Sequence, residues 1–242
     1  MNVATPAIRL EPGDAAFPRR VTALFSGTLW AIGNTQLLDY RAIGICGSRG
    51  ASASGLERSY EFGREVAGMK AVVVSGYARG VDRQAHKGAL EGGGATIAVL
   101  PEGILHFKVP KELQPLVDLE TNFLAVSMFE PDDRWQTWRA MQRNKLIVGL
   151  SMGLFVVEAR GKGGTIDAAE ESRRQRKPVY VVDFLNDLPG REGNRELMRQ
   201  FAMPIRTVRE LRRALEAVLT QQHETPARQL SLTIGEGSNG CE

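Results

Sequence analysis

Short apolar segments alternate with longer amphipathic segments along most of this chain, and this rhythm limits the folds that it can adopt. The apolar segments are rich in Val, Ile and Ala and do not alternate with polar residues, as is typical of strands buried on both faces of a sheet. They lie at 42–46, 71–74, 96–100, 123–126, 154–157 and 179–182. Helices are predicted between them at 55–68, 81–92, 134–150 and 165–176. The alternation predicts an α/β fold with a mostly parallel sheet and helices on both faces.

The segment before this core has a different composition. Residues 1–20 are rich in Pro, Gly and charge, which predicts an irregular arm. Residues 21–40 contain enough Leu, Ile and Trp to pack on the main domain. We therefore divide the start of the chain into a lead-in segment at 1–40 and a main domain at 41–185.

The segment after the main domain, residues 186–222, is expected to hold a loop and one helix. Residues 187–196 are charged and contain glycine, which predicts the loop. Residues 207–219 place apolar side chains on one helical face behind Thr207, a residue type that caps helix N-termini. The polar residues 223–242 are expected to form a flexible tail.

Bulk composition excludes several classes of protein and leaves nucleic-acid binding open. The formal charge of the 242 residues is only +3, so net charge alone argues weakly for a polyanionic partner. The two cysteines, Cys46 and Cys241, form neither a disulfide framework nor a zinc pattern, which favours a reduced, cytoplasmic setting. The first residues do not resemble a secretory signal, and no apolar run approaches the roughly 18 residues of a membrane span. We expect no metal, no cofactor and no membrane partner.

The turn after the first apolar segment is a candidate phosphate site, because ligands of open parallel sheets bind beyond the carboxyl ends of the strands. Gly47, Ser48 and Arg49 begin a stretch of small residues that reaches Gly55. Small residues let a phosphate approach backbone N–H groups at the start of a helix, and an arginine can hold it in a bidentate manner. A tight turn with a solvated arginine explains the segment equally well.

A second turn of small residues follows the next apolar segment and also opens a predicted helix. Its candidate phosphate ligands are Ser75, Gly76, Arg79 and Gly80. Asp82 and His86 come next and, being four residues apart, share one face of that helix. They could form a catalytic pair, but a structural hydrogen bond is the favoured interpretation because no Ser or Cys nucleophile accompanies them.

The predicted helix before the 154–157 segment combines cations with aromatic residues. Its candidate phosphate ligands are Arg143, Asn144 and Lys145, for which a solvated rim is an equally good explanation. Trp135 and Trp138 could stack on the bases of a single strand, but we favour core packing for them.

The fourth candidate segment is a glycine-rich loop that contains Lys162, Gly163, Gly164 and Thr165. Thr165 is placed to cap the helix that follows. The lysine precedes the glycine pair, so the loop is not a Walker A motif, although it is a reasonable anion cradle. A mobile surface loop is the alternative.

Taken together, the four turns predict a positive groove lined with backbone donors at one edge of one sheet. Such a groove suits a phosphate-bearing polymer or a nucleotide. Its affinity for a polyanion should fall steeply as the salt concentration rises.

These segments resemble the DprA/Smf family of DNA-processing proteins over about residues 10–185. The resemblance rests on FPRRVTALFSGTLWAIGN (17–34), IGICGSRGAS (43–52), SGYARGVDRQAH (75–86), GGATIAVLPEGI (93–104), QRNKLIVGLS (142–151) and VVEARGKGGTIDAA (156–169). The order and spacing of the motifs agree with the family, and the 75–86 motif is the most specific of them.

The resemblance implies an extended Rossmann-like, doubly wound fold and a homodimer without enzymatic turnover. It also implies sequence-independent binding of single-stranded DNA and loading of a RecA-type recombinase. Carried over by position, Arg49, Arg143 and Lys145 would grip phosphates. The pocket walls would be Gly47, Ser48, Ser75, Gly76, Gly163, Gly164 and Thr165.

The chain departs from the family pattern in ways that bear on its partners. Val109-Pro110 stands where members usually have an aromatic residue before the proline, and Asp183-Phe184 replaces a Pro-Gly. We also expect too little chain for both the N-terminal helical domain and the C-terminal winged helix of many members. Two alternatives therefore stay open: a sensor of a nucleotide signal, and a nucleotide phosphoribohydrolase, whose Pro-Gly-Gly-x-Gly-Thr loop is only partly matched at 162–167.

Overall fold

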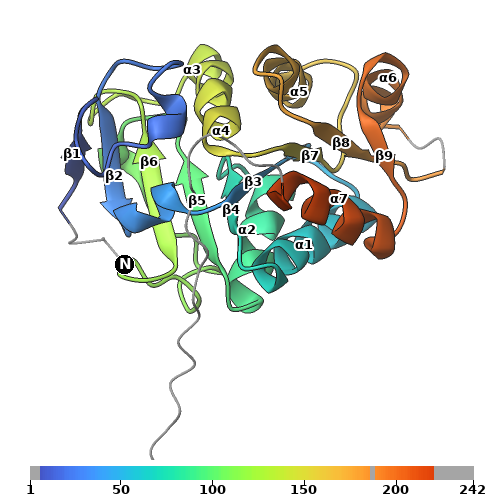
Figure 1. Cartoon of the computed structure of the whole chain (residues 1–242), viewed down its shortest axis with the longest axis horizontal. Coiled ribbons are helices and arrows are strands. Elements are labelled where there is room, and N and C mark those ends of the chain that lie inside the picture. The colour runs from blue at the N-terminus through green and yellow to red at the C-terminus, as the bar shows by residue number, and fades with distance from the viewer. Residues whose placement is uncertain (1–5, 186–188, 221–242) are drawn as a thin grey trace, which may run out of the picture.

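A computed structural model describes residues 6–185 and 189–220 as a single nine-stranded sheet covered by helices on both faces (Figure 1). The strand order is β1-β2-β6-β5-β4-β3-β7-β8-β9. All neighbours from β6 to β9 in this order are parallel, while β2 pairs antiparallel with β6 and β1 antiparallel with β2. The predicted Rossmann-like α/β fold is therefore confirmed.

All six predicted strands are present, and each is within one residue of its predicted bounds. They are β3 (Ala42–Cys46), β4 (Val72–Ser75), β5 (Ala95–Val99), β6 (Phe123–Ser127), β7 (Leu154–Val156) and β8 (Val179–Val182). The chain runs outward from β3 through β4 and β5 to β6, then returns to the other side of β3 as β7. The direction of winding thus reverses between β3 and β7, and a crevice is expected beyond the carboxyl ends of those two strands.

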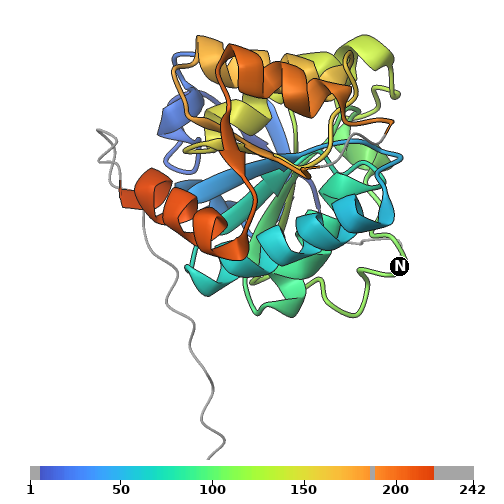
Figure 2. The ribbon, with the colours of Figure 1, turned by 90° about the vertical axis from the view of Figure 1, so that its right-hand side faces the viewer.

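One face of the sheet is covered by α1 (Ala53–Gly68), α2 (Val81–Glu91) and α7 (Val208–Thr220), as Figure 2 shows. Helices α1 and α2 lie unusually close because glycines face each other's backbone. A Cβ on Gly63 of α1 would overlap the carbonyl oxygen of Ala85, and one on Gly88 of α2 would overlap that of Tyr60. Glycine at these two positions allows the helices to bring their apolar stripes onto the sheet together.

The opposite face is covered by α3 (Thr137–Gln142), α4 (Asn144–Leu150), α5 (Gly164–Arg174) and α6 (Glu192–Gln200) (Figure 1). Helix α4 packs on the β3–β6 part of the sheet, and α5 and α6 pack on β7 and β8. The single helix predicted at 134–150 is in fact two, with Arg143 at the junction between them.

Two predictions for the flanking segments need correction. The arm predicted at 1–20 contains β1 (Ile8–Leu10), which pairs with β2 (Leu29–Gly33). The loop predicted at 187–196 ends early, because α6 begins at Glu192 and leads to an unpredicted edge strand, β9 (Met203–Ile205).

The helix predicted at 207–219 is confirmed as α7, and the Thr207 hydroxyl accepts a hydrogen bond from the Glu210 amide at 3.2 Å. Thr165 does not cap α5, because that helix already begins at Gly164. The predicted tail at 223–242 lies outside the described residues. Within the described ranges, none of the helices has the length and apolar character needed to cross a bilayer.

Candidate nucleic-acid interface

A pocket of about 440 Å³ opens where the winding reverses, beyond the carboxyl ends of β3 and β7. Four stretches of chain line it: the turn after β3, the turn between β4 and α2, the segment around the junction between α3 and α4, and the loop between β7 and α5. Ten of the predicted site residues line the pocket: Gly47, Ser48, Arg49, Asp82, Arg143, Asn144, Lys162, Gly163, Gly164 and Thr165.

The turn after β3 is held in place from two sides. A Cβ on Gly47 would lie 2.6 Å from a methyl carbon of Val81, so glycine lets the turn lie against the start of α2. The Ser48 amide donates to the Glu158 carbonyl at 2.7 Å, and the Ser48 carbonyl accepts from the Val81 amide at 3.2 Å. The backbone conformation of the turn is therefore set before any ligand binds.

Arg49 extends from this turn with an exposed side chain. Its guanidinium lies over the ring of Trp135, 5.6 Å from the ring centre, a favourable contact between a cation and the negative face of an aromatic ring. The contact keeps the positive charge at the mouth of the pocket while leaving the guanidinium accessible to an anion.

Arg143 occupies a different position from the one expected of a phosphate ligand. Its side chain is buried, and its Nη1 donates to the Val99 carbonyl at 2.8 Å while its Nε donates to the Ala140 carbonyl at 3.2 Å. The guanidinium lies against the backbone of Gly76, where a Cβ would overlap it. Burial lowers the pKa of this guanidinium, and the neighbouring Asp82 carboxylate acts in the opposite direction. Arg143 thus supplies positive potential to the pocket floor while its hydrogen bonds go to the protein.

Asn144 joins the junction between α3 and α4 to the loop between β7 and α5. Its side-chain amide donates to the Gly164 carbonyl and to the Asp167 carboxylate, both at 3.0 Å. These bonds fix the first turn of α5, whose free N–H groups give the helix N-terminus a partial positive charge. Gly163, just before the helix, has φ of +117°, a conformation that L side chains rarely adopt. Lys162 is exposed beside it.

Besides His86, five predicted site residues lie outside the lining. Ser75 is buried and its hydroxyl donates to the Ile45 carbonyl at 2.6 Å, while Gly76 lies behind Arg143. Gly80 has φ of +80° and packs on the backbone of the turn after β3, so its contribution is conformational. The side chains of Arg79 and Lys145 are exposed but do not reach the described pocket wall.

Asp82 and His86 do not bond to each other, so neither the catalytic nor the structural form of that pair is observed. The Asp82 carboxylate accepts from the Ala78 amide at 3.3 Å, whereas Nδ1 of His86 pairs with the Thr96 hydroxyl at 2.6 Å. His86 is fully buried, and burial lowers the pKa of its imidazole to about 3. The ring is therefore neutral at physiological pH and belongs to the core.

The prediction that Trp135 and Trp138 pack in the core is wrong. Their side chains are 45% and 53% exposed, and Trp135 lines the pocket together with Met141. Arg160, the other cation of the glycine-rich loop that contains Lys162, also lines the pocket. Four residues of this segment that line the pocket share one helical face, and their spacing could have indicated this part of the pocket wall: Thr137, Ala140, Met141 and Asn144.

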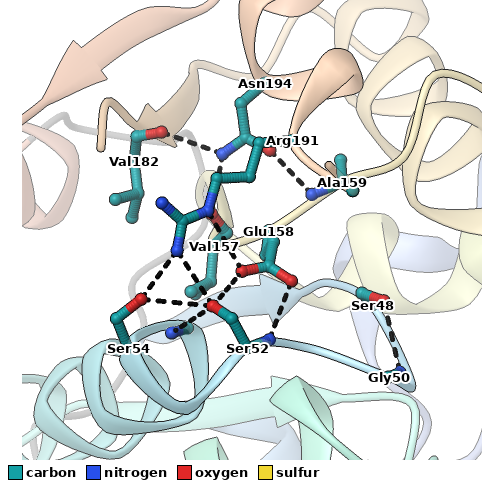
Figure 3. Close-up of polar contacts among 12 residues, drawn as sticks. Ser48, Gly50, Ser52, Ser54, Val157, Glu158, Ala159, Val182, Arg191 and Asn194 are labelled. Atoms are coloured by element: carbon teal, nitrogen blue, oxygen red, sulfur yellow. Dashed lines mark hydrogen bonds and ion pairs between the residues drawn. The ribbon is translucent and has the colours of Figure 1, made fainter. Parts of the chain in front are cut away.

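A buried polar cluster behind the pocket fixes the turn after β3 to the end of β7 (Figure 3). The Glu158 carboxylate accepts from the Ser52 amide at 3.0 Å and from the Ser52 hydroxyl at 2.5 Å. Arg191 approaches the same carboxylate at 3.4 Å and donates to the hydroxyls of Ser52 and Ser54 at 2.9 and 2.7 Å. Since Ser52 is the N-cap of α1, the cluster positions both the turn and the helix that follows it.

Arg191 and Asn194 come from a segment for which only a loop was predicted. The Arg191 guanidinium lies 3.6 Å from the ring centre of Phe184, and only 3% of its side chain is exposed. The Asn194 side chain accepts from the Ala159 amide at 2.7 Å and donates to the Val157 and Val182 carbonyls at 2.8 Å (Figure 3). This segment therefore closes the back of the site and ties β7 to β8.

Comparison with known proteins places these features in one family. Residues 10–216 match the family described as DNA recombination-mediator protein A. The DNA processing protein DprA of Bacillus subtilis is 31% identical over 178 residues, which are 73% of this chain and 60% of that protein. The chain thus spans about 60% of the length of the first curated relatives that it matches.

Two solved structures are similar across most of the chain. DNA processing protein A from Streptococcus pneumoniae has a TM-score of 0.74 at 27% identity, covering 87% of this chain and 74% of that one. DNA processing protein A from Helicobacter pylori, described for its unique mode of binding single-stranded DNA, has a TM-score of 0.73 at 26% identity. That match covers 92% of this chain and 100% of the other.

Proposed function

This chain belongs to the DNA recombination-mediator protein A family, the DprA/Smf family, and we propose that its pocket binds single-stranded DNA without regard to sequence. The observation that carries the proposal is the charge of the wall. Four cations, Arg49, Arg143, Arg160 and Lys162, line the described pocket against one carboxylate, Asp82. A phosphate is common to every nucleotide, so a wall built for phosphates gives affinity without sequence information.

The backbone of the pocket supports the same function. The N-terminus of α5 lines the pocket with N–H groups that have no partner within the helix, and the Asn144 side chain holds this end of the helix in place. Such preorganised donors lose little freedom when an anion binds, which favours affinity. The exposed cations are then available to neutralise the phosphates on either side.

We further propose that the protein acts without chemical turnover, as a homodimer that passes the bound strand to a RecA-type recombinase. Family membership supports this part of the proposal. It is tested by measuring RecA filament formation on strands covered by a single-strand-binding protein. Acceleration by this chain is the expected result, and an unchanged rate would contradict the mediator role.

The DNA-binding role is tested by fluorescence anisotropy with a labelled oligo-dT strand at two salt concentrations. Arg49→Ala should weaken binding roughly tenfold to a hundredfold, as expected when a charge-assisted hydrogen bond is lost. Arg213→Ala, an exposed arginine on α7 across the sheet, is the matched control and should bind like the wild type. Affinity should also fall steeply with salt and be higher for the single strand than for a duplex.

Equal affinities of the wild type and the Arg49 variant would count against the assignment of this pocket. The nucleotide alternatives are tested with the same protein. Release of free adenine from AMP would show a phosphoribohydrolase, and competition by AMP far stronger than by oligo-dT would show a nucleotide sensor.

A further inference from the structure

The C-terminal end of α4 is held by two cations instead of the glycine that commonly follows a helix. A helix leaves its last four carbonyl oxygens without a partner inside the helix. The carbonyl oxygens that accept from Nζ of Lys177, at 2.6 to 2.8 Å, are those of Val148, Gly149 and Ser151. Nη1 of Arg20 donates to the carbonyl oxygen between them, that of Leu150, at 2.9 Å. Four consecutive carbonyl groups are thus bound by side chains from other parts of the chain.

Lys177 also joins the ends of two helices that begin at the pocket. It lies in the turn between α5 and β8, and its amide donates to the Ser172 carbonyl in the last turn of α5 at 2.9 Å. Its side chain binds the end of α4. Asn144 makes the corresponding connection at the other end, where both helices line the pocket. Because α4 has seven residues, its two ends are only about 10 Å apart, and a displacement of one end is passed to the other.

The charge at this end of α4 is not balanced by an acidic side chain. Among the residues that the structure describes, no carboxylate lies within ion-pair distance of Lys177 or Arg20, and Asp39 acts on Arg20 only at longer range. The acidic residues near the end of α5, Glu170 and Glu171, are paired with arginines of their own helix. Strands β7 and β8 carry no charged side chain. The carbonyl dipoles at the negative end of α4 therefore hold the ammonium group.

The amine of Lys177 can lose its proton near neutral pH. Burial, with a smaller contribution from the charge of Arg20, lowers the pKa of this amine to about 7. The charged form has three N–H donors for the three carbonyl oxygens, whereas the neutral amine has two. Loss of the proton therefore removes one bond to the end of α4 and weakens the others.

We propose that Lys177 is a positioning residue, whose protonated amine holds α4 where Arg143 and Asn144 complete the pocket wall. This inference rests on the proposed function and adds regulation by a proton that lies outside the described lining. An anion in the pocket favours the protonated amine, and by linkage the protonated amine favours the anion. The affinity for a single strand should therefore fall as the pH rises through neutrality.

The first test measures the dissociation constant of a labelled oligo-dT strand between about pH 6 and about pH 9, at one salt concentration, by fluorescence anisotropy. The strand carries no terminal phosphate, whose own titration would change its charge in this range. The wild type should bind about fivefold or more weakly at the upper end, a typical coupling between two sites. Lys177→Met should bind weakly at every pH. Lys177→Arg keeps its charge throughout and should bind tightly at every pH.

Two matched controls separate Lys177 from other groups that respond to pH. His106→Gln removes a histidine outside the described lining, and histidine ordinarily titrates near neutral pH. Lys111→Met removes an exposed lysine that also lies outside the lining. Both variants should keep the wild-type dependence of affinity on pH.

A second measurement needs no variant that might fail to fold. NMR of the wild type with ¹³C-labelled lysine side chains gives the pKa of Lys177 with and without oligo-dT, and this pKa should rise when the strand binds. The rise should match the loss of affinity across the pH range, because the two are linked.

The outcomes separate the positioning role from the function on which it rests. A wild-type affinity that does not change with pH, a Lys177 pKa that oligo-dT leaves unchanged, or a pH dependence that persists in Lys177→Met would overturn the positioning role and leave DNA binding standing. A wild type that fails to bind oligo-dT at any pH at low salt would overturn the proposed function itself. Thermal unfolding of each variant at both ends of the pH range shows whether the fold is intact.

Discussion

The buried pair of Glu158 and Arg191 should contribute far more to the stability of this fold than any pair on its surface. The two side chains are 4% and 3% exposed, and the Glu158 carboxylate also accepts both Ser52 donors. Removing one partner leaves an uncompensated charge where water cannot solvate it. Arg191→Met is therefore expected to cost about 3–5 kcal/mol of unfolding free energy.

That cost is a large share of the roughly 5–15 kcal/mol that stabilises a typical domain. For a chain of this size it corresponds to a drop in melting temperature of roughly 6–20 °C. Glu158→Gln should show a comparable loss, because Arg191 then keeps its charge without the carboxylate. The double variant should cost less than the sum of the two single variants, by about 0.5–3 kcal/mol, because neither buried charge remains.

The assay is urea unfolding followed by circular dichroism, with the slope of free energy against urea checked for two-state behaviour. The control is the surface pair of Arg212 and Glu65, whose side chains are 58% and 21% exposed. Arg212→Met should cost no more than about 1 kcal/mol, since exposed pairs contribute little. Two results would refute the reasoning: an Arg191→Met variant that loses no more unfolding free energy than Arg212→Met, or losses in the Glu158 and Arg191 single variants that add up to the loss in the double variant. Either would show that the buried pair does not stabilise the fold as its burial indicates.

Two further predictions concern the core beneath the pocket. Gly63→Ala should destabilise the protein by about 1–3 kcal/mol, because the added methyl group would overlap the Ala85 carbonyl. The control, Gly68→Ala, should not destabilise it, because the space around Gly68 is open. Urea unfolding measures the stability of both variants. The pKa of His86 is about 3 in the fold and near 6.5 in the unfolded chain. Between these pH values the unfolded state therefore binds one more proton than the folded state. The free energy of unfolding should fall as the pH falls through this range, by up to about 1.4 kcal/mol per pH unit. His86→Gln should flatten that part of the curve of stability against pH, and an identical slope in the variant would contradict it.

The central sheet could be predicted because strands that are buried on both faces consist almost entirely of apolar residues. Strands such as Ala42–Cys46 and Val179–Val182 are continuous apolar runs, and their observed bounds equal the predicted ones. The edge strand Met203–Ile205 has only one buried residue and contains a proline, so nothing in its composition separates it from a loop. Helix α6 was missed for a related reason: few of its residues are buried, and its main contribution is through Asn194 and the preceding Arg191.

In the candidate site, too, some features could be predicted from composition, whereas others depend on how the side chains pack. Glycine-rich turns after β3 and β7 could be assigned to one edge of the sheet, because the carboxyl ends of parallel strands meet there. Which cations reach the pocket could not be assigned that way. Arg143 and Lys145 are two residues apart, yet one is buried in the floor and the other is exposed outside the described wall. Their exposure differs because side chains two positions apart on a helix point in different directions. Of these two residues, Arg143 is the one that faces Gly76.

Trp135 shows how an exposed residue of a pocket can be mistaken for a core residue. Tryptophan carries more apolar area than most side chains, so burial is the reasonable expectation when sequence alone is known. In this fold the helix break at Arg143 makes α3 a separate helix beside the mouth of the pocket, and Trp135 stays at its exposed start. The buried guanidinium of Arg143, held by the Val99 and Ala140 carbonyls, lies at that break. Arg143, which was expected to bind phosphate, thus donates its hydrogen bonds to the protein, and Trp135, which was expected in the core, is exposed at the pocket.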